Sequence, residues 1–247
     1  MEQTTIENFT VFYQNPEELQ ALTKEIFTDE EYRVELKKSH PLIIDCGSHI
    51  GLSLLYFKKV YPQAKIISFE PDPVNFEILQ QNIAANKLTG VSSVNVALAA
   101  QNGTVILYSS DKQTSENDWS WGNTTVPAFK SGNVQKTVQG VKLSSYLNDR
   151  VDLIKMDIEG AELEVLQEIE PQLNRVNQII LEYHGLPKSK TNQFSKVLRI
   201  LKNNFPDVIV FDKKPSSQSW RWEFFKKTGV PLFHIKNPYY FIVKARR

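Results

Sequence analysis

From Pro41 onward, short apolar runs alternate with amphipathic stretches along the chain. Leu42–Ile44 is predicted to be a buried strand, and the residues after Gly51 carry the apolar spacing of a helix. The same pattern predicts six further strands, at 65–69, 91–98, 151–156, 178–183, 207–211 and 239–243. Strands that alternate with helices indicate an α/β fold, in which a mostly parallel sheet carries helices on both faces.

The N-terminal residues are predicted to form a helical cover over 1–40. Asn15 can cap a first helix with Pro16 in its first turn, and Thr28 can start a second one. We expect this cover to pack on a main domain that spans 41–247.

One polar segment interrupts the alternation within the main domain. The strands predicted at 103–110 and 138–143 are separated by a stretch rich in Ser, Asn and Thr that includes Trp119 and Trp121. A loop of this length inside a compact domain is usually functional or disordered. This insert, at about 109–136, is predicted to be a mobile flap over a bound ligand.

The most specific motif is Asp45-Cys46-Gly47-Ser48-His49-Ile50-Gly51, a glycine turn between the first strand and a helix. Its spacing differs from the G-x-G-x-x-G turn of dinucleotide-binding enzymes and from the phosphate loop that ends in Gly-Lys-Ser/Thr. In open α/β sheets, ligands bind where such turns follow the strands. The candidate contacts to a cofactor are therefore Asp45, Gly47, Ser48, His49 and Gly51.

An acidic residue follows the next strand, at Glu70-Pro71. An acid about twenty residues beyond a glycine turn can accept hydrogen bonds from both hydroxyls of a ribose. The turn and the acid together predict a site for a nucleoside-containing cofactor, with Glu70 and Pro71 beside the ribose.

Acidic residues and a histidine follow two later strands. Asp157 ends the strand at 151–156, and Glu182 and His184 lie two residues apart at the end of the strand at 178–183, so they share a face. A histidine can act as a general base near neutral pH. Alternatively, the three side chains can hold a divalent cation. Asp157, Glu182 and His184 are therefore the candidate catalytic residues, and the same three are the candidate metal ligands.

Three strings together resemble the FkbM family of S-adenosylmethionine (SAM)-dependent methyltransferases. They are Ile44–Gly51, Phe69–Pro73 and Asp152–Glu162. The resemblance implies a class I methyltransferase fold, a Rossmann-like three-layer sandwich whose seven-stranded sheet has an antiparallel last strand. It also implies methyl transfer from SAM, usually to a hydroxyl oxygen of a sugar or secondary metabolite, with some members acting on carboxylates. Asp157 is then a cofactor contact as well.

Two other interpretations of the same motifs remain. An NAD-dependent enzyme would have a third glycine in the G-x-G-x-x-G spacing, which this turn lacks. A methyltransferase-like binding module without catalysis would keep the fold, although the intact Glu70 and Asp157 argue against it. An O-methyltransferase is therefore the main prediction, with SAM as cofactor and Mg²⁺ as an optional second one.

Composition and charge narrow the partners. A net charge of +1 over 247 residues gives no basis for a nucleic-acid-binding tail. No apolar run approaches the length of a membrane span, and the first residues lack the pattern of a secretory signal. The single Cys46 cannot form an internal disulfide, which fits a reducing cytoplasm. We therefore expect a cytoplasmic enzyme with a small-molecule acceptor, without a nucleic-acid partner or stable membrane insertion.

Overall fold

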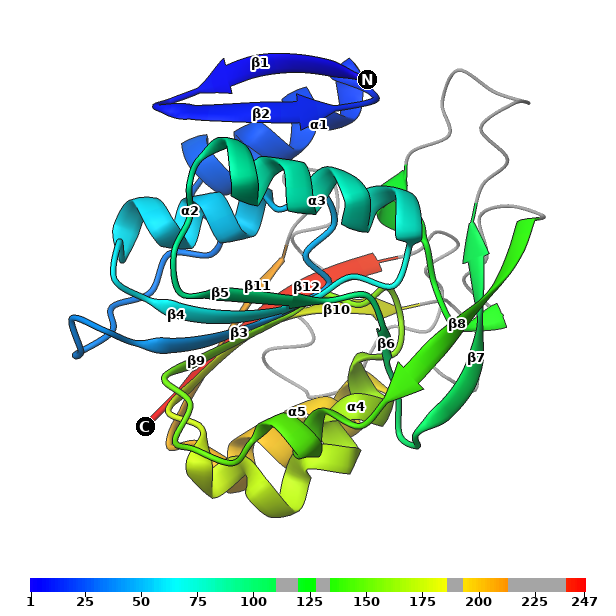
Figure 1. The fold of residues 1–247 in the computed structure, drawn as a ribbon. Helices are drawn as coiled ribbons and strands as arrows, with labels where there is room; N and C mark the ends of the chain where they lie inside the picture. Colours follow the sequence, from blue (N-terminus) through cyan, green and yellow to red (C-terminus); the bar gives the residue numbers. More distant parts are fainter. Residues whose placement is uncertain (110–119, 128–133, 186–192, 213–238) are drawn as a thin grey trace.

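The computed structural model describes residues 1–109, 120–127, 134–185, 193–212 and 239–247. A seven-stranded sheet forms its centre, in the order β11-β12-β10-β9-β3-β4-β5 (Figure 1). The strands are β3 (Leu42–Cys46), β4 (Lys65–Phe69), β5 (Val91–Val94), β9 (Leu153–Met156), β10 (Gln178–Gly185), β11 (Asp207–Asp212) and β12 (Tyr239–Arg246). The pairs from β10 to β5 are parallel, and β12 lies antiparallel between β10 and β11. The predicted fold class, with its antiparallel last strand, is confirmed.

Helices cover both faces of the sheet (Figure 1). One face carries α2 (Leu52–Val60) and α3 (Pro73–Ala85), and the other carries α4 (Glu162–Ile169) and α5 (Phe194–Asn204). Consecutive residues of β3 enter different cores, because Ile43 packs with the α2–α3 side and Ile44 with the α4–α5 side. Strands buried on both faces appear in the sequence as continuous apolar runs, which explains why they could be predicted.

The N-terminal cover expected over 1–40 is only partly helical, which corrects the prediction. Its elements are β1 (Glu2–Ile6), β2 (Phe9–Tyr13), α1 (Pro16–Thr23) and a π-helix at Lys24–Thr28, after which no helix follows before β3. Asn15 caps α1, as its sequence indicates. The β1–β2 hairpin is held by tertiary contacts, because Asn82 on α3 and Asn86, which follows α3 directly, exchange hydrogen bonds with the backbone of β2. Such distant partners leave no local sequence signal.

The strand predicted at 91–98 divides in two, which is a second correction. β5 stays in the main sheet, whereas β6 (Ala97–Leu98) pairs with β8 (Val134–Val141) in a separate sheet of order β6-β8-β7. β7 (Gly103–Ser109) and β8 flank the polar insert. The apolar pattern continues through Val94 and Val96 across the division, so the sequence shows no break there.

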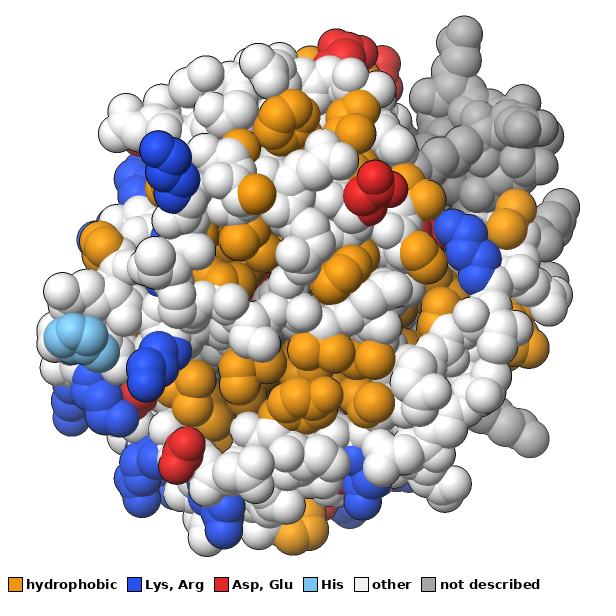
Figure 2. Space-filling view, viewed as in Figure 1, with side chains coloured by type: hydrophobic (Ala, Val, Ile, Leu, Met, Phe, Trp, Pro, Cys, Tyr) orange, Lys and Arg blue, Asp and Glu red, His pale blue; other side chains and the backbone are white. Residues whose placement is uncertain are grey.

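Within the insert expected at 109–136, the structure describes residue 109, 120–127 with a 3-10 turn at Ser120–Gly122, and 134–136, which belong to β8. The remainder of its loop and the aromatic stretch at 215–238 lie outside the described residues. None of the described helices combines the length and apolar character needed to cross a bilayer. On the face seen in Figure 2, apolar side chains gather over the layer between the sheet and α5, with charged side chains around them.

Candidate active site

The glycine turn after β3 is fixed by backbone contacts to both neighbouring strands. The amides of Gly47 and Ser48 donate to the carbonyl of Phe69 at the end of β4, at 3.1 and 2.9 Å. Gly47 has a φ of +83°, and a Cβ atom there would lie 1.8 Å from the carbonyl oxygen of Asp157, which follows β9. Only glycine fits this position. The turn therefore brings the ends of β3, β4 and β9 close together.

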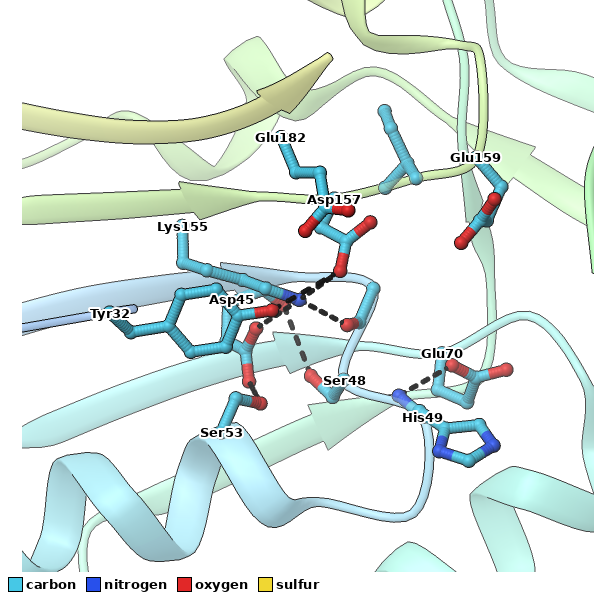
Figure 3. A network of polar contacts seen from close by, with 12 residues as sticks. Tyr32, Asp45, Ser48, His49, Ser53, Glu70, Lys155, Asp157, Glu159 and Glu182 are labelled. Carbon is cyan, nitrogen blue, oxygen red and sulfur yellow. Dashed lines mark hydrogen bonds and ion pairs between the residues drawn. The ribbon is translucent and has the colours of Figure 1, made fainter. Parts of the chain in front are cut away.

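Glu70 follows β4 and holds the glycine turn through its side chain (Figure 3). Its Oε2 accepts a hydrogen bond from the amide of His49 at 2.8 Å, and its Oε1 accepts one from the amide of Asp72 at 2.9 Å. Glu70 is only 5% exposed, and burial raises its pKa to about 7. Each carboxylate oxygen has a second lone pair, so Glu70 keeps acceptor capacity toward the cavity that it lines.

The strand ends enclose a cavity whose empty volume, counted to its open mouth, is about 800 Å³. The predicted cofactor contacts that line it are Gly47, Ser48, His49, Glu70, Pro71 and Asp157. Asp45 and Gly51 are not among its lining residues. An apolar wall is formed by Phe69, Val96, Ala97, Leu98 and Leu107.

A buried lysine that the sequence analysis does not single out lies beside the cavity (Figure 3). Lys155 Nζ donates to the Gly47 carbonyl at 2.6 Å and lies 3.6 Å from Asp45 Oδ1 and 3.4 Å from Asp157 Oδ2. Burial alone lowers the pKa of Lys155, but the carboxylates of Asp157 and Asp45 outweigh burial and raise it above its usual value. The sequence does contain a signal for this residue, because Lys155 is a lone lysine within the apolar strand β9. A buried ammonium group needs a partner that is also buried.

Asp45 supports the site from behind the cavity. It is fully buried, and its Oδ2 accepts a hydrogen bond from Ser53 Oγ of α2 at 2.6 Å. Burial raises the pKa of Asp45, although Lys155 and Ser53 oppose that effect. Asp45 therefore ties Lys155 and α2 to the glycine turn.

The acids and the histidine predicted at the ends of β9 and β10 do meet. His184 Nε2 lies 3.3 Å from a carboxylate oxygen of Glu159, 3.7 Å from Glu182 and 3.8 Å from Asp157. On the opposite side of the ring, Nδ1 lies 3.0 Å from Glu162 Oε1. Asp157, Glu182 and His184 offer ligand atoms that all lie within 4.8 Å of one another. This arrangement can hold protons or a divalent cation.

The charges in this cluster favour bound protons. Burial alone lowers the pKa of His184, but the carboxylates of Glu159 and Glu162 outweigh burial and raise it well above the usual value. Burial raises the pKa of Glu159 to about 8, and the carboxylates of Asp157 and Glu182 add to this rise. A histidine that stays protonated is a poor general base. His184 is therefore not poised to accept a proton in this arrangement.

The described part of the insert closes on the glycine turn. Ser120 Oγ lies 2.7 Å from His49 Nε2 and donates to a carboxylate oxygen of Glu18 on α1 at 3.1 Å. Ser120, Asn123 and Thr125 line the cavity. Nothing in the sequence around Glu18 or Ser120 indicates this contact, because it joins residues far apart in the chain. The flap function of the insert stays a prediction.

Comparison with known proteins identifies the family. Residues 45–205 match the model of the methyltransferase FkbM domain. The methyltransferase sdnD of Sordaria araneosa is 35% identical over 193 residues, which cover 67% of this chain and 74% of that protein. The 2-O-methyltransferase NoeI of Sinorhizobium fredii (strain NBRC 101917 / NGR234) is 26% identical over 160 residues, which cover 60% of this chain and 65% of that protein.

A solved structure shares the fold. The crystal structure of methyltransferase FkbM from Methylobacillus flagellatus KT superposes with a TM-score of 0.51 at 14% identity, covering 94% of this chain and 55% of that one. The family match extends from the glycine turn through the acids after β9 to α5. The chain therefore belongs to the FkbM family of methyltransferases.

Proposed function

We propose that this protein transfers a methyl group from SAM to a hydroxyl oxygen of a small-molecule acceptor. The observation that carries the proposal is Glu70, a buried carboxylate that both holds the glycine turn and lines the cavity. Its remaining lone pairs can accept hydrogen bonds from the two hydroxyls of a ribose. Membership of a methyltransferase family supports SAM as the nucleoside compound that binds there.

The cavity fits the other parts of SAM. Phe69, Val96 and Leu98 offer an apolar wall to the adenine ring, and Asp157 offers a carboxylate to the cationic amino-acid end. Glu70 follows β4 and Asp157 follows β9, the two strands that flank β3. At the usual spacing between neighbouring strands, the axes of β4 and β9 lie about 10 Å apart. When bound, SAM supplies an electrophilic methyl group on its sulfonium.

Calorimetry with S-adenosylhomocysteine (SAH) and with NAD tests the cofactor. We expect the protein to bind SAH but not NAD. We expect Glu70→Gln to weaken SAH binding about 10- to 100-fold, because it removes charge-assisted hydrogen bonds worth about 1.5–3 kcal/mol. Glu77→Gln, which neutralises an exposed acid on α3, is the matched control. NAD binding in place of SAH would contradict the proposal, and unchanged SAH affinity in Glu70→Gln would exclude Glu70 from the site.

The choice of a hydroxyl acceptor rests on a relative and on charge. NoeI is named as a 2-O-methyltransferase. Asp157 and Glu159 line the cavity, whereas Glu182 and His184 are not among its lining residues, and the Asp157 carboxylate repels an anionic acceptor. A neutral hydroxyl is therefore favoured over a carboxylate, which is the second candidate acceptor.

Incubation of cell extract with the enzyme and labelled SAM, followed by mass spectrometry, identifies the acceptor. We expect the label in an ether that withstands mild base. A label released by mild base would indicate a methyl ester and therefore a carboxylate acceptor. If the protein binds SAH but no labelled product forms in any extract, a methyltransferase-like binding module without catalysis would be favoured.

We assign removal of the hydroxyl proton to Asp157, Glu182 and His184. An alcohol is a poor nucleophile at neutral pH, so a base or a metal ion is required. Either His184 loses its proton to solvent when the acceptor binds and then accepts the hydroxyl proton, or Asp157, Glu182 and His184 would hold a divalent cation, which would lower the pKa of the hydroxyl. Ligand atoms of the three residues lie within 4.8 Å of one another, so the arrangement is compatible with either version.

Turnover of the wild type and of His184→Ala, each with and without EDTA, separates these versions. If a cation acts, EDTA abolishes wild-type activity until Mg²⁺ or Mn²⁺ is restored. If His184 is the base, EDTA has no effect and His184→Ala loses about 10²–10⁴-fold in rate. Full activity of His184→Ala in EDTA would exclude both versions.

A further inference from the structure

Tyr32 reaches the cavity from outside the segment that matches the family, residues 45–205. It lies in the irregular connection that leads to β3, and only 6% of its surface is exposed. Its hydroxyl donates to Asp157 Oδ2 at 3.3 Å, and its ring lies over the Lys155 ammonium at 5.2 Å. Figure 3 shows the ring beside Lys155, below Asp157.

Two donors therefore meet one oxygen of Asp157. Lys155 Nζ lies 3.4 Å from Oδ2, the same oxygen that receives the Tyr32 hydroxyl. The other oxygen, Oδ1, faces His184 Nε2 at 3.8 Å. The Asp157 side chain remains 21% exposed. Its carboxylate is thus fixed through one oxygen while part of the group stays open to the cavity.

We propose that Tyr32 is a positioning residue that orients Asp157 toward the cationic amino-acid end of SAM, an inference that rests on the proposed function. A carboxylate held in one orientation loses less side-chain freedom when the ligand binds, so its attraction for a cation contributes more to affinity. The Tyr32 ring also confines the Lys155 ammonium through a cation–π contact, which keeps the second donor to Oδ2 in place.

Calorimetry with two probes tests this role. SAH carries the α-ammonium group, whereas 5′-methylthioadenosine lacks the amino-acid part. Tyr32→Phe keeps the ring and its packing on Phe57, with centroids 6.3 Å apart, and removes only the hydroxyl. We expect SAH binding to weaken about three- to tenfold, because the freed Asp157 side chain must then be ordered when the ligand binds. Binding of 5′-methylthioadenosine should change less than about twofold on the same reasoning.

Tyr61→Phe is the matched control. Like Tyr32, Tyr61 contacts the connection that leads to β3, but the hydrogen bonds of its hydroxyl go to Val34 and Leu36 rather than to Asp157. Its hydroxyl donates to the carbonyl of Val34 at 2.7 Å and accepts from the amide of Leu36 at 3.0 Å. We expect SAH binding in this variant to stay within about twofold of the wild type. The control separates a loosened connection from the loss of the Asp157 contact.

A double-mutant cycle with Asp157→Ala supplies a second measurement. If Tyr32 acts through Asp157, Tyr32→Phe has little further effect on SAH affinity once Asp157 is absent. Equal weakening of both probes, additive effects in the cycle, or wild-type SAH binding by Tyr32→Phe would each overturn the inference. Failure of the wild type to bind SAH would instead contradict the proposed function.

Discussion

The buried Glu70 links the stability of this protein to pH in a way that one substitution can test. Its pKa is about 7 in the folded protein, against an ordinary value of 4.5. Between these values the folded protein keeps a proton that the unfolded chain has released. The stability associated with this proton is therefore fully present below pH 4.5 and is lost as the pH rises through about 7. At about 1.4 kcal/mol for each pKa unit, the loss reaches about 3 kcal/mol.

Glu70→Gln should abolish this loss. A neutral amide has nearly the shape of a protonated carboxyl group, but only its oxygen accepts, so the variant loses one of the two hydrogen bonds from the amides of His49 and Asp72. Without ligand, we expect the variant to be less stable than the wild type by about 1–3 kcal/mol near pH 4.5, and to gain up to about 3 kcal/mol relative to the wild type between pH 4.5 and pH 8. For a chain of this size, that gain corresponds to roughly 6–12 °C in Tm.

Thermal unfolding of ligand-free wild type, Glu70→Gln and Glu77→Gln, in steps from acidic to alkaline pH, measures this effect. The other titrating groups act alike in all three proteins, so the Tm difference between Glu70→Gln and wild type isolates Glu70. The exposed Glu77 reports the effect of removing one surface charge. A Tm difference between Glu70→Gln and the wild type that stays flat with pH would refute the reasoning.

Three further predictions address other parts of the structure. Gly47→Ala should lose at least about 3 kcal/mol in urea unfolding, because its Cβ would lie 1.8 Å from the carbonyl oxygen of Asp157 at a φ of +83°; wild-type stability would contradict the geometry of the turn. If Asp157, Glu182 and His184 hold a cation, Mg²⁺ or Mn²⁺ added after EDTA treatment should raise the Tm of the wild type but not of His184→Ala; equal shifts would mean that the ion binds elsewhere. Asn82→Ala should lower the free energy of unfolding by about 2–3 kcal/mol and speed proteolysis of the β1–β2 hairpin, because the backbone of Phe12 loses its side-chain partner. Unchanged proteolysis would show that the hairpin is held by other contacts.

The main sheet and its helices could be predicted because their signals are local. The central strands are buried on both faces, so each appears as a short apolar run, and Asn15 caps α1 through the amides that directly follow it. The turn at Gly47 and the acid at Glu70 were also predictable. Each directly follows a strand, and the two strands, β3 and β4, are parallel neighbours whose carboxyl ends lie at the same edge of the sheet. The β1–β2 hairpin was not, since Asn82 and its neighbours on α3 hold it from a distant part of the chain.

Within the site, the sequence by itself determined which acids and which histidine lie at the ends of the strands. Only the tertiary structure decided their partners and their charge. Tyr32 and Asp157 are 125 residues apart in the chain, and no periodicity connects them. The pKa values of Lys155 and His184 rise above their ordinary values only because folding places carboxylates beside each of them. Burial and distance set these interactions, and neither quantity exists until the chain is folded.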